Sequence, residues 1–113
     1  GVYSSPADLA KWDEVLRRNV LFSEEEFREA LLPVSVPGPG PEEPDGTPAA
    51  YGFGWFLNAW RGRARMWHYG ETTGFRTAMH RFPMDGLTVV VLCNRSDLEA
   101  SALALEAAAV CLF

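Results

Sequence analysis

The chain of 113 residues is long enough for one domain with a sizeable core, since a compact chain of this length buries roughly two-thirds of its unfolded surface. A hydrophobic content of 48% excludes a disordered protein, and a net charge of −5 does not suit binding to nucleic acid or to an anionic membrane. Residues 1–46 hold ten acidic and four basic side chains, whereas residues 47–95 hold six basic and two acidic ones. This basic segment either favours an anionic or carboxylate ligand or is an ordinary solvated surface.

The two cysteines, Cys93 and Cys111, form neither a disulfide framework nor a metal-ligand spacing. Each lies in an apolar run, so we expect two small buried side chains, and we expect no cofactor. No apolar run reaches the roughly 18 residues of a transmembrane helix, so no membrane span is predicted.

A helix is predicted close to the start of the chain. Ser5 can cap it, Pro6 suits the first helical position, and Asp8 falls where the acid of a capping box belongs. An apolar stripe at helical spacing follows, formed by Leu9, Trp12, Val15 and Leu16.

A second helix follows after a short break. Ser23 and Glu26 repeat the capping box, and Phe22 with Phe27 makes a hydrophobic staple around it. The helix should run to about Leu32, because the proline that follows stops it.

Residues 33–50 contain six of the eight prolines and three glycines, so neither a helix nor a strand can persist through them. A loop of this length is unusual in a compact domain. It is a lid, a long crossing loop or a disordered linker, and the interpretation we favour is disorder or a plain connector.

From residue 51 onward the period of the pattern changes to two, which predicts four strands. Glycines in the first strand leave room for a close neighbour, and the last strand is apolar almost throughout, which indicates cover on both faces. With a turn at residues 61–63 and another at Pro83–Gly86, the predicted strands are Tyr51–Leu57, Ala64–Tyr69, Phe75–Phe82 and Leu87–Cys93.

A third capping box, Ser96 with Glu99, predicts a last helix from Leu98 to Leu112. That helix is apolar nearly all round, so we expect it to be buried all round, although the chain offers few elements to cover it. The predicted class is α+β, an antiparallel sheet of about four strands with two N-terminal helices and one C-terminal helix.

The segment from His68 to Phe75, with the sequence HYGETTGF, is the part of the chain most suited to chemistry. Gly70 and Gly74 bracket a stretch in which backbone N–H groups can approach a ligand oxygen. Donors of this kind, aimed at a developing oxyanion, are each worth roughly 3 kcal/mol of the barrier. His68 either contacts a substrate carboxylate, supports a proton relay, or is a structural histidine.

The chain resembles the C-terminal part of the serine β-lactamase and penicillin-binding-protein superfamily, in the branch of class C β-lactamases, DD-carboxypeptidases and esterases. The order and spacing of several motifs match that family over nearly the whole chain, which covers about the last third of a complete family domain. The segments that carry the likeness are Gly1–Ala10, Tyr51–Trp55, His68–Phe75, Phe82–Pro83 and Leu87–Arg95.

Three motifs build the active site in that family, and only one of them is present here. A Ser-x-x-Lys pair supplies nucleophile and base, a Tyr-x-Asn element assists proton transfer, and a Lys- or His-x-Gly strand forms the opposite wall. His68-Tyr69-Gly70 corresponds to the third motif. The resemblance implies that His68 contacts the substrate carboxylate or the proton network, and that the N–H of Glu71 forms half of an oxyanion hole. No serine of this chain has a lysine three residues on, and Lys11 is the only lysine.

The motif departs from the family pattern at two positions. Tyr69 stands where the family usually has a small or hydroxyl-bearing residue, so its ring either crowds the cleft or points into the core. Glu71 places a carboxylate where negative charge is to be stabilised, which disfavours an anionic acyl substrate unless that side chain points away. We therefore take His68 and Glu71 as candidate catalytic residues and Tyr69, Gly70 and Gly74 as candidate substrate-binding residues.

His80, on a neighbouring strand, is the other histidine. With His68 it offers at most two metal ligands and no third is evident, so no metal site is predicted. The four tryptophans are expected to fill the core and the walls of the cleft rather than to stack on a nucleobase.

Two functions are compatible with these motifs. In the first, the chain is the C-terminal segment of a β-lactamase-like serine hydrolase that cleaves a small amide or ester through an acyl-serine, and it is inactive alone. In the second, it is a non-catalytic binding or assembly module. The resemblance implies that the opening strands of the family domain pair with the far side of the strand Leu87–Cys93. Those strands are absent from these residues, so its outer edge should be open, and we expect self-association through this edge or through the C-terminal helix.

Overall fold

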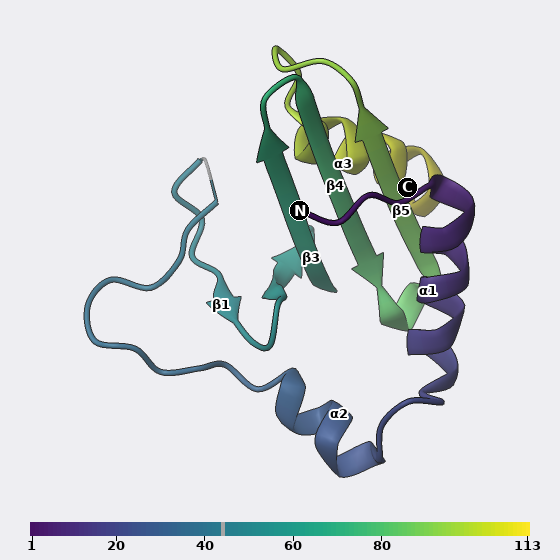
Figure 1. Ribbon diagram of the computed structural model, residues 1–113. Helices are drawn as coiled ribbons and strands as arrows, with labels where there is room; N and C mark the ends of the chain where they lie inside the picture. Colours follow the sequence, from purple (N-terminus) through teal and green to yellow (C-terminus); the bar gives the residue numbers. More distant parts are fainter. Residues whose placement is uncertain (44) are drawn as a thin grey trace.

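The computed structural model describes residues 1–43 and 45–113, which form three α-helices, a short 3₁₀ helix and five strands (Figure 1). The predicted α+β class is confirmed, with five strands instead of about four because a two-residue strand precedes the others. The elements are α1 (Pro6–Arg18), α2 (Glu24–Ala30), β1 (Ala50–Tyr51), β2 (Phe56–Trp60), β3 (Arg63–Thr72), β4 (Phe75–Phe82), η1 (Pro83–Asp85), β5 (Leu87–Cys93) and α3 (Ala100–Leu112).

The sheet is an antiparallel meander in which neighbours in sequence are neighbours in space, in the order β1-β2-β3-β4-β5. Two tight turns fix its register. Arg61 and Gly62, both with positive φ, form the two-residue loop between β2 and β3, as a type I′ turn requires. Thr73 and Gly74 form the loop between β3 and β4, with φ of 82° at the glycine.

The helices α1 and α3 pack on opposite faces of the sheet. Side chains alternate along a strand, so Ala78 and Arg81 of β4 point to different faces. Ala78 packs in a core cluster with Ala100 and Ala104 of α3. Arg81 instead forms an ion pair of 2.6 Å with Asp13 of α1. Small alanines on α3 let the helix approach the sheet closely, and Figure 1 shows α3 behind β4 and β5 with α1 beside β5.

The first two helix starts follow the predicted caps. The hydroxyl of Ser5 accepts a hydrogen bond from the N–H of Asp8, and Ser23 with Glu26 forms a complete capping box. The second helix ends at Ala30 rather than at about Leu32, because the last N–H groups bond three residues back, in a tighter turn.

The predicted strand Tyr51–Leu57 is wrong, because the chain turns between β1 and β2. Gly52 donates to the carbonyl of Trp55 over 2.8 Å, and Gly54 has φ of 79°. The predicted close neighbour of a glycine is confirmed at Gly52, because a Cβ there would lie only 2.5 Å from the carbonyl oxygen of Ala30 in α2. The second predicted strand is longer than expected, from Arg63 to Thr72, and the last two are confirmed.

The predicted start of the last helix is also wrong. Ser96 and Glu99 form no capping box, and α3 begins at Ala100 with no side-chain cap. The residues before the helix instead form a bend, across which Arg95 pairs with Asp97 over 2.7 Å.

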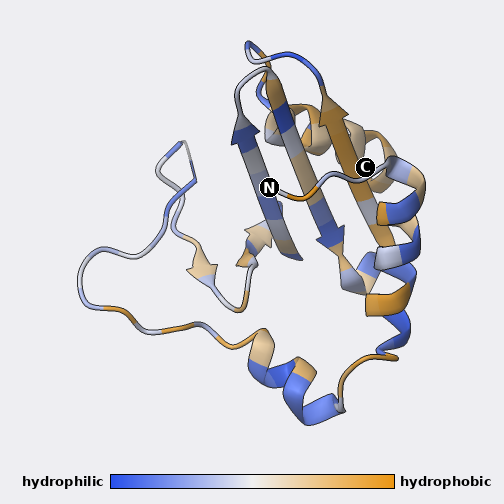
Figure 2. Cartoon of the chain, viewed as in Figure 1, coloured by the Kyte–Doolittle hydropathy of each residue, from blue (hydrophilic) through white to orange (hydrophobic). Residues whose placement is uncertain are grey.

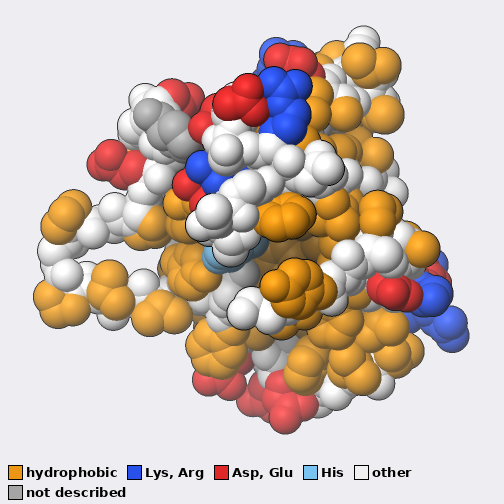
Figure 3. Space-filling model, turned by 45° about the horizontal axis from the view of Figure 1, so that its top comes forward, with side chains coloured by type: hydrophobic (Ala, Val, Ile, Leu, Met, Phe, Trp, Pro, Cys, Tyr) orange, Lys and Arg blue, Asp and Glu red, His pale blue; other side chains and the backbone are white. Residues whose placement is uncertain are grey.

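Neither α3 nor the cysteines are buried as predicted. Only one stripe of α3, formed by Ala100, Ala104 and Ala108, is fully buried, while Val110 is 86% exposed. Cys93 is half-buried and Cys111 is exposed. Figure 2 shows that α3 and β5 are mainly hydrophobic, whereas α1 and α2 are mainly hydrophilic. Figure 3 shows hydrophobic side chains over much of one face, with charged side chains in separate clusters.

The described residues of 33–49 form a connector without a helix or strand, and Ala50 already belongs to β1; residue 44 lies outside the described residues. Val34 ties the connector to β1 by donating to the carbonyl of Tyr51 over 2.8 Å, and Glu42 forms an isolated bridge with Pro48 within the connector. Glu43 accepts hydrogen bonds of 2.6 Å from both Asn58 and Arg65. These contacts lie on the side of β2 and β3, so the segment does not cover β5 (Figure 1).

The strand β5 lies at the outer edge of the sheet, as expected, and no other strand of residues 1–43 and 45–113 pairs with its far side. None of the helices in this part of the chain is long and apolar enough to cross a bilayer.

Candidate active-site strand

His68 lies on β3 at the point where the pairing with β2 ends. The last pair of that ladder is Phe56 with Trp67, whereas the ladder with β4 continues to Thr72. Among the described residues, 68–72 therefore have a strand partner on one side only. Such an edge presents backbone N–H and C=O groups that a ligand can use.

Both ring nitrogens of His68 are hydrogen-bonded. Nδ1 lies 2.6 Å from the carbonyl oxygen of Tyr69, and Nε2 lies 2.9 Å from the hydroxyl oxygen of Tyr51. A carbonyl oxygen only accepts, so Nδ1 carries the proton. In the neutral ring Nε2 then accepts a hydrogen bond from the Tyr51 hydroxyl.

Aromatic rings surround His68 and hold it at the edge. The ring of Phe56 lies 5.2 Å from that of His68 and 4.8 Å from that of Tyr51, the latter in an edge-to-face arrangement. Tyr69 is half-exposed and stacks parallel to Phe56 at 5.9 Å. The Tyr69 ring therefore lies on the surface beside the motif and does not point into the core.

The strand opposite leaves no room for a side chain at Gly70. A Cβ at this position would lie 2.6 Å from the hydroxyl oxygen of Thr77, its partner on β4. Gly74 meets nothing within 4 Å and is required for its positive φ in the hairpin loop. The two glycines thus serve different purposes, close packing in one case and chain reversal in the other.

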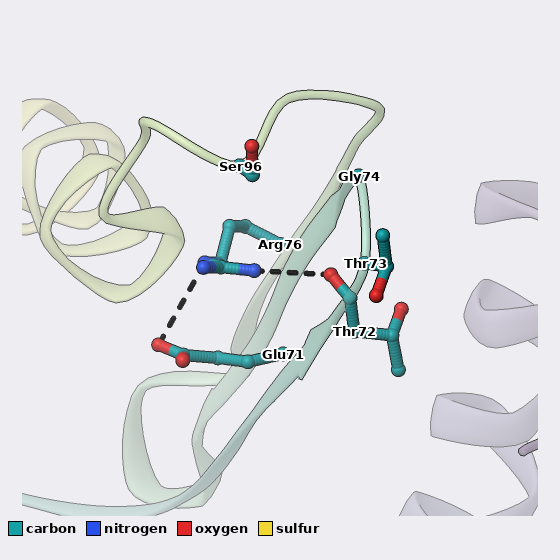
Figure 4. A pocket seen from close by; sticks show the side chains of 6 residues that line it. All are labelled: Glu71, Thr72, Thr73, Gly74, Arg76 and Ser96. Atoms are coloured by element: carbon teal, nitrogen blue, oxygen red, sulfur yellow. Dashed lines mark hydrogen bonds and ion pairs between the residues drawn. The ribbon is translucent and has the colours of Figure 1, made fainter.

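The carboxylate of Glu71 is turned toward Arg76, its partner on β4. The ion pair measures 3.8 Å, and Arg76 also donates to the carbonyl oxygen of Thr72 over 3.1 Å (Figure 4). An open pocket of about 460 Å³ lies here, lined by Glu71, Thr72, Thr73, Gly74, Arg76 and Ser96. Arg76 offsets the negative charge that Glu71 brings to this end of the strand.

His80 does not contact His68, because the two side chains lie on opposite faces of the sheet. His80 is fully buried on the face that carries α3. Its Nε2 lies 3.2 Å from the hydroxyl of Ser101, and its Nδ1 lies 3.4 Å from Arg65, a donor, so Nε2 carries the proton. Burial, and then the charge of Arg65, lower the pKa of His80 to about 3. Burial also lowers the pKa of Arg65, against the opposing effect of Glu43. The described residues contain no cluster of three or more potential metal ligands.

Comparisons with known proteins identify the family of this chain. The sequence model of the Beta-lactamase family matches residues 1–111, nearly the whole length. The chain belongs to the β-lactamase family. A search of curated proteins found no match. Among solved structures, a penicillin-binding protein from Bacillus halodurans is similar, with a TM-score of 0.67 and 23% identity over 95% of this chain. The match covers 30% of the Bacillus chain, so the present chain spans about a third of that protein's length.

The sequence of this β-lactamase-family chain predicted the motif strand but not three residues that contact it: Tyr51, Arg76 and Thr77. The contacts of Arg76 and Thr77 could have been predicted, because a two-residue loop at Thr73-Gly74 sets the register that places them opposite Glu71 and Gly70. No local signal pairs Tyr51 with His68, which lies 17 residues on.

Proposed function

We propose that this chain supplies one wall of a serine acyl-transfer site that hydrolyses small amides or esters, and that the serine and lysine belong to polypeptide outside these 113 residues. The observation that carries the proposal is the His-x-Gly motif on the singly paired segment of β3, in a chain of the β-lactamase family. The absence of a Ser-x-x-Lys from the chain is consistent with it.

In this proposal the edge of β3 binds the reacting carbonyl. The backbone N–H of Glu71 donates to the oxyanion, and the nucleophilic serine supplies the second donor. Only the N–H of Glu71 is needed, and the pairing of its carboxylate with Arg76 supports that role. His68 takes part in the proton transfers that accompany acylation and deacylation.

Turnover of a chromogenic amide or ester by the polypeptide extended upstream to a Ser-x-x-Lys tests this proposal, with the two histidines as a matched pair. His68→Ala should lower kcat/KM about 100-fold to 10,000-fold, the usual range for a group engaged in proton transfer. His80→Ala removes the same side chain from the neighbouring strand, on the opposite face, and should lower stability while the folded enzyme keeps its turnover. Equal turnover in the wild type and the His68 variant would refute the role of His68 in proton transfer.

A second candidate function is assembly through the sheet. The edge of β5 is unpaired by any described strand, and Leu103 and Val110 expose apolar surface on α3. Open edges and apolar patches recruit partners, so a homo-oligomer is the expected product. Sedimentation velocity tests it, and a monomer at every concentration would remove this candidate.

A further inference from the structure

The hydrogen bond between Tyr51 and His68 is the feature that the proposed function does not yet use. Tyr51 belongs to β1, two strands away from β3, and its hydroxyl reaches His68 just beyond the end of β2. The bond therefore joins β1 to β3 directly, through two side chains.

Several contacts fix the position of Tyr51 before any ligand arrives. Its backbone pairs with Phe56, and its carbonyl accepts a hydrogen bond of 2.8 Å from Val34. Its ring packs edge-to-face on Phe56, and the next residue, Gly52, presses against α2. These contacts hold the backbone and the ring of Tyr51, so its hydroxyl is preorganised and a bond to it carries little ordering cost.

The bond decides which chemistry is open to His68. Nδ1–H is donated to the carbonyl of Tyr69 and the lone pair on Nε2 is occupied by Tyr51, so the neutral ring has no free donor and no free acceptor. A direct hydrogen bond from His68 to a substrate carboxylate would require one of these two bonds to break. A proton arriving at Nε2 has to come through the Tyr51 hydroxyl, which can accept a replacement proton on its own oxygen.

We propose that Tyr51 is a positioning residue for His68, and that it makes His68 part of a proton relay rather than a direct ligand of a substrate carboxylate. This inference rests on the proposed function for its catalytic meaning, but the arrangement itself can be measured without substrate.

The first measurement is made on the wild-type chain and needs no variant. Long-range ¹H–¹⁵N correlation spectra at about pH 8, where an ordinary histidine is neutral, report which nitrogen carries the proton in each of the two rings. We expect opposite tautomers, with Nδ1–H in His68 and Nε2–H in His80. A His68 ring with Nε2–H, or with rapid exchange between the two tautomers, would overturn the proposal.

The second measurement is the rate at which diethyl pyrocarbonate, which attacks a free imidazole lone pair, modifies His68, followed by mass spectrometry. Tyr51→Phe frees Nε2, and because one ordinary hydrogen bond is lost the rate should rise about fivefold. The controls are Tyr69→Phe, on a ring 6.0 Å from that of His68, and Tyr3→Phe, on a residue that is 96% exposed. Neither hydroxyl bonds to His68, so both variants should leave the rate unchanged. Buried His80 is the unreactive internal reference.

Equal rates in the wild type and the Tyr51 variant would overturn the inference. If the Tyr51 variant fails to fold, the tautomers of the two histidines in the wild type test the inference without it. Failure of the proposed function is a separate outcome, since absent turnover in the upstream-extended polypeptide leaves both measurements on the Tyr51 bond intact.

Discussion

At the scale of single residues, the two histidines show how environment assigns different roles to one side chain. His68 lies at a strand edge with its nitrogens bonded to Tyr69 and Tyr51, whereas His80 is fully buried between Arg65 and Ser101. The cationic form of His80 is disfavoured by burial and by Arg65, so this ring is a structural group.

The depressed pKa of His80 predicts a pH dependence of stability. Its pKa is about 3 in the folded chain, against 6.5 as the ordinary value, so between these values the unfolded state binds more protons. The contribution of neutral His80 to the free energy of unfolding is fully present above about pH 6.5 and is lost as the pH falls toward 3. One proton corresponds to about 1.4 kcal/mol per pH unit, or about 2 kcal/mol between about pH 7 and about pH 5.

Urea unfolding at several pH values measures this effect. His80→Gln should flatten the dependence, because its amide does not titrate, while the wild-type dependence should persist in His68→Gln. The same slope in all three proteins would show that His80 is not the group responsible.

Gly70 provides a second test at this scale. Gly70→Ala places a Cβ 2.6 Å from the hydroxyl of Thr77 and should destabilise the chain by about 1–3 kcal/mol, as overpacking does. Adding Thr77→Ala removes that oxygen and should restore most of the loss. A double variant as unstable as Gly70→Ala alone would mean that the contact with Thr77 is not the reason for the glycine. Urea unfolding of the four proteins gives the coupling energy.

At the level of elements, the side chain of Glu43 ties the connector before β1 to the sheet. The carboxylate of Glu43 pairs with Arg65, whose side chain is fully buried, and also accepts a hydrogen bond from Asn58. Arg65 in turn lies over the ring of Trp67 at 4.8 Å. The anchor therefore joins the connector to the core beneath β2 and β3.

Glu43→Gln should release that anchor. It leaves the buried charge of Arg65 without its counter-ion, a change worth about 3 kcal/mol or more. Glu42→Gln alters the exposed residue next to it and should change stability by less than about 0.5 kcal/mol. Urea unfolding and limited proteolysis within 33–50 should separate the two variants, and equal behaviour would contradict the anchor.

Elements bounded by local chemistry could be predicted from the sequence, and those bounded by tertiary contacts could not. The caps at Ser5 and Ser23 are bonds within one turn, and their helices begin as expected. The capping pattern at Ser96 is equally good locally, but the chain bends there, and α3 begins at Ala100, where it packs on the sheet.

The same distinction holds for the candidate site. The motif residues and, through the hairpin register, their partners on β4 are encoded within a dozen residues. The pairing of Tyr51 with His68 depends on where β2 begins, and that is set by the turn at Gly52 against α2. No periodicity in the sequence reports a contact of this kind.

At the scale of the whole molecule, the chain exposes apolar surface beyond what its own elements cover. One stripe of α3 packs on the sheet, while Leu103 and Val110 remain exposed, and β5 ends the sheet among the described strands. The penicillin-binding protein of similar fold is about three times as long as this chain.

If copies of the chain share that surface with one another, charge on α3 should prevent it. Val110→Glu places a carboxylate on the most exposed apolar position of the helix and should shift the chain toward monomer in sedimentation velocity. Thr73→Glu adds the same charge in the hairpin loop between β3 and β4 and should leave the association state unchanged. A wild type and a Val110 variant with the same sedimentation coefficient would place any association elsewhere.

In the proposed function, these residues form one wall of an acyl-transfer site whose nucleophile lies outside them. Intact-mass spectrometry after exposure to a fluorophosphonate or a penicillin tests it most directly. The 113-residue chain should remain unmodified, whereas the polypeptide extended upstream to a Ser-x-x-Lys should gain one acyl or phosphonyl group on that serine. An adduct on a serine of the 113-residue chain, lost when that serine is changed to alanine, would show that the nucleophile lies within these residues and would contradict the proposed function.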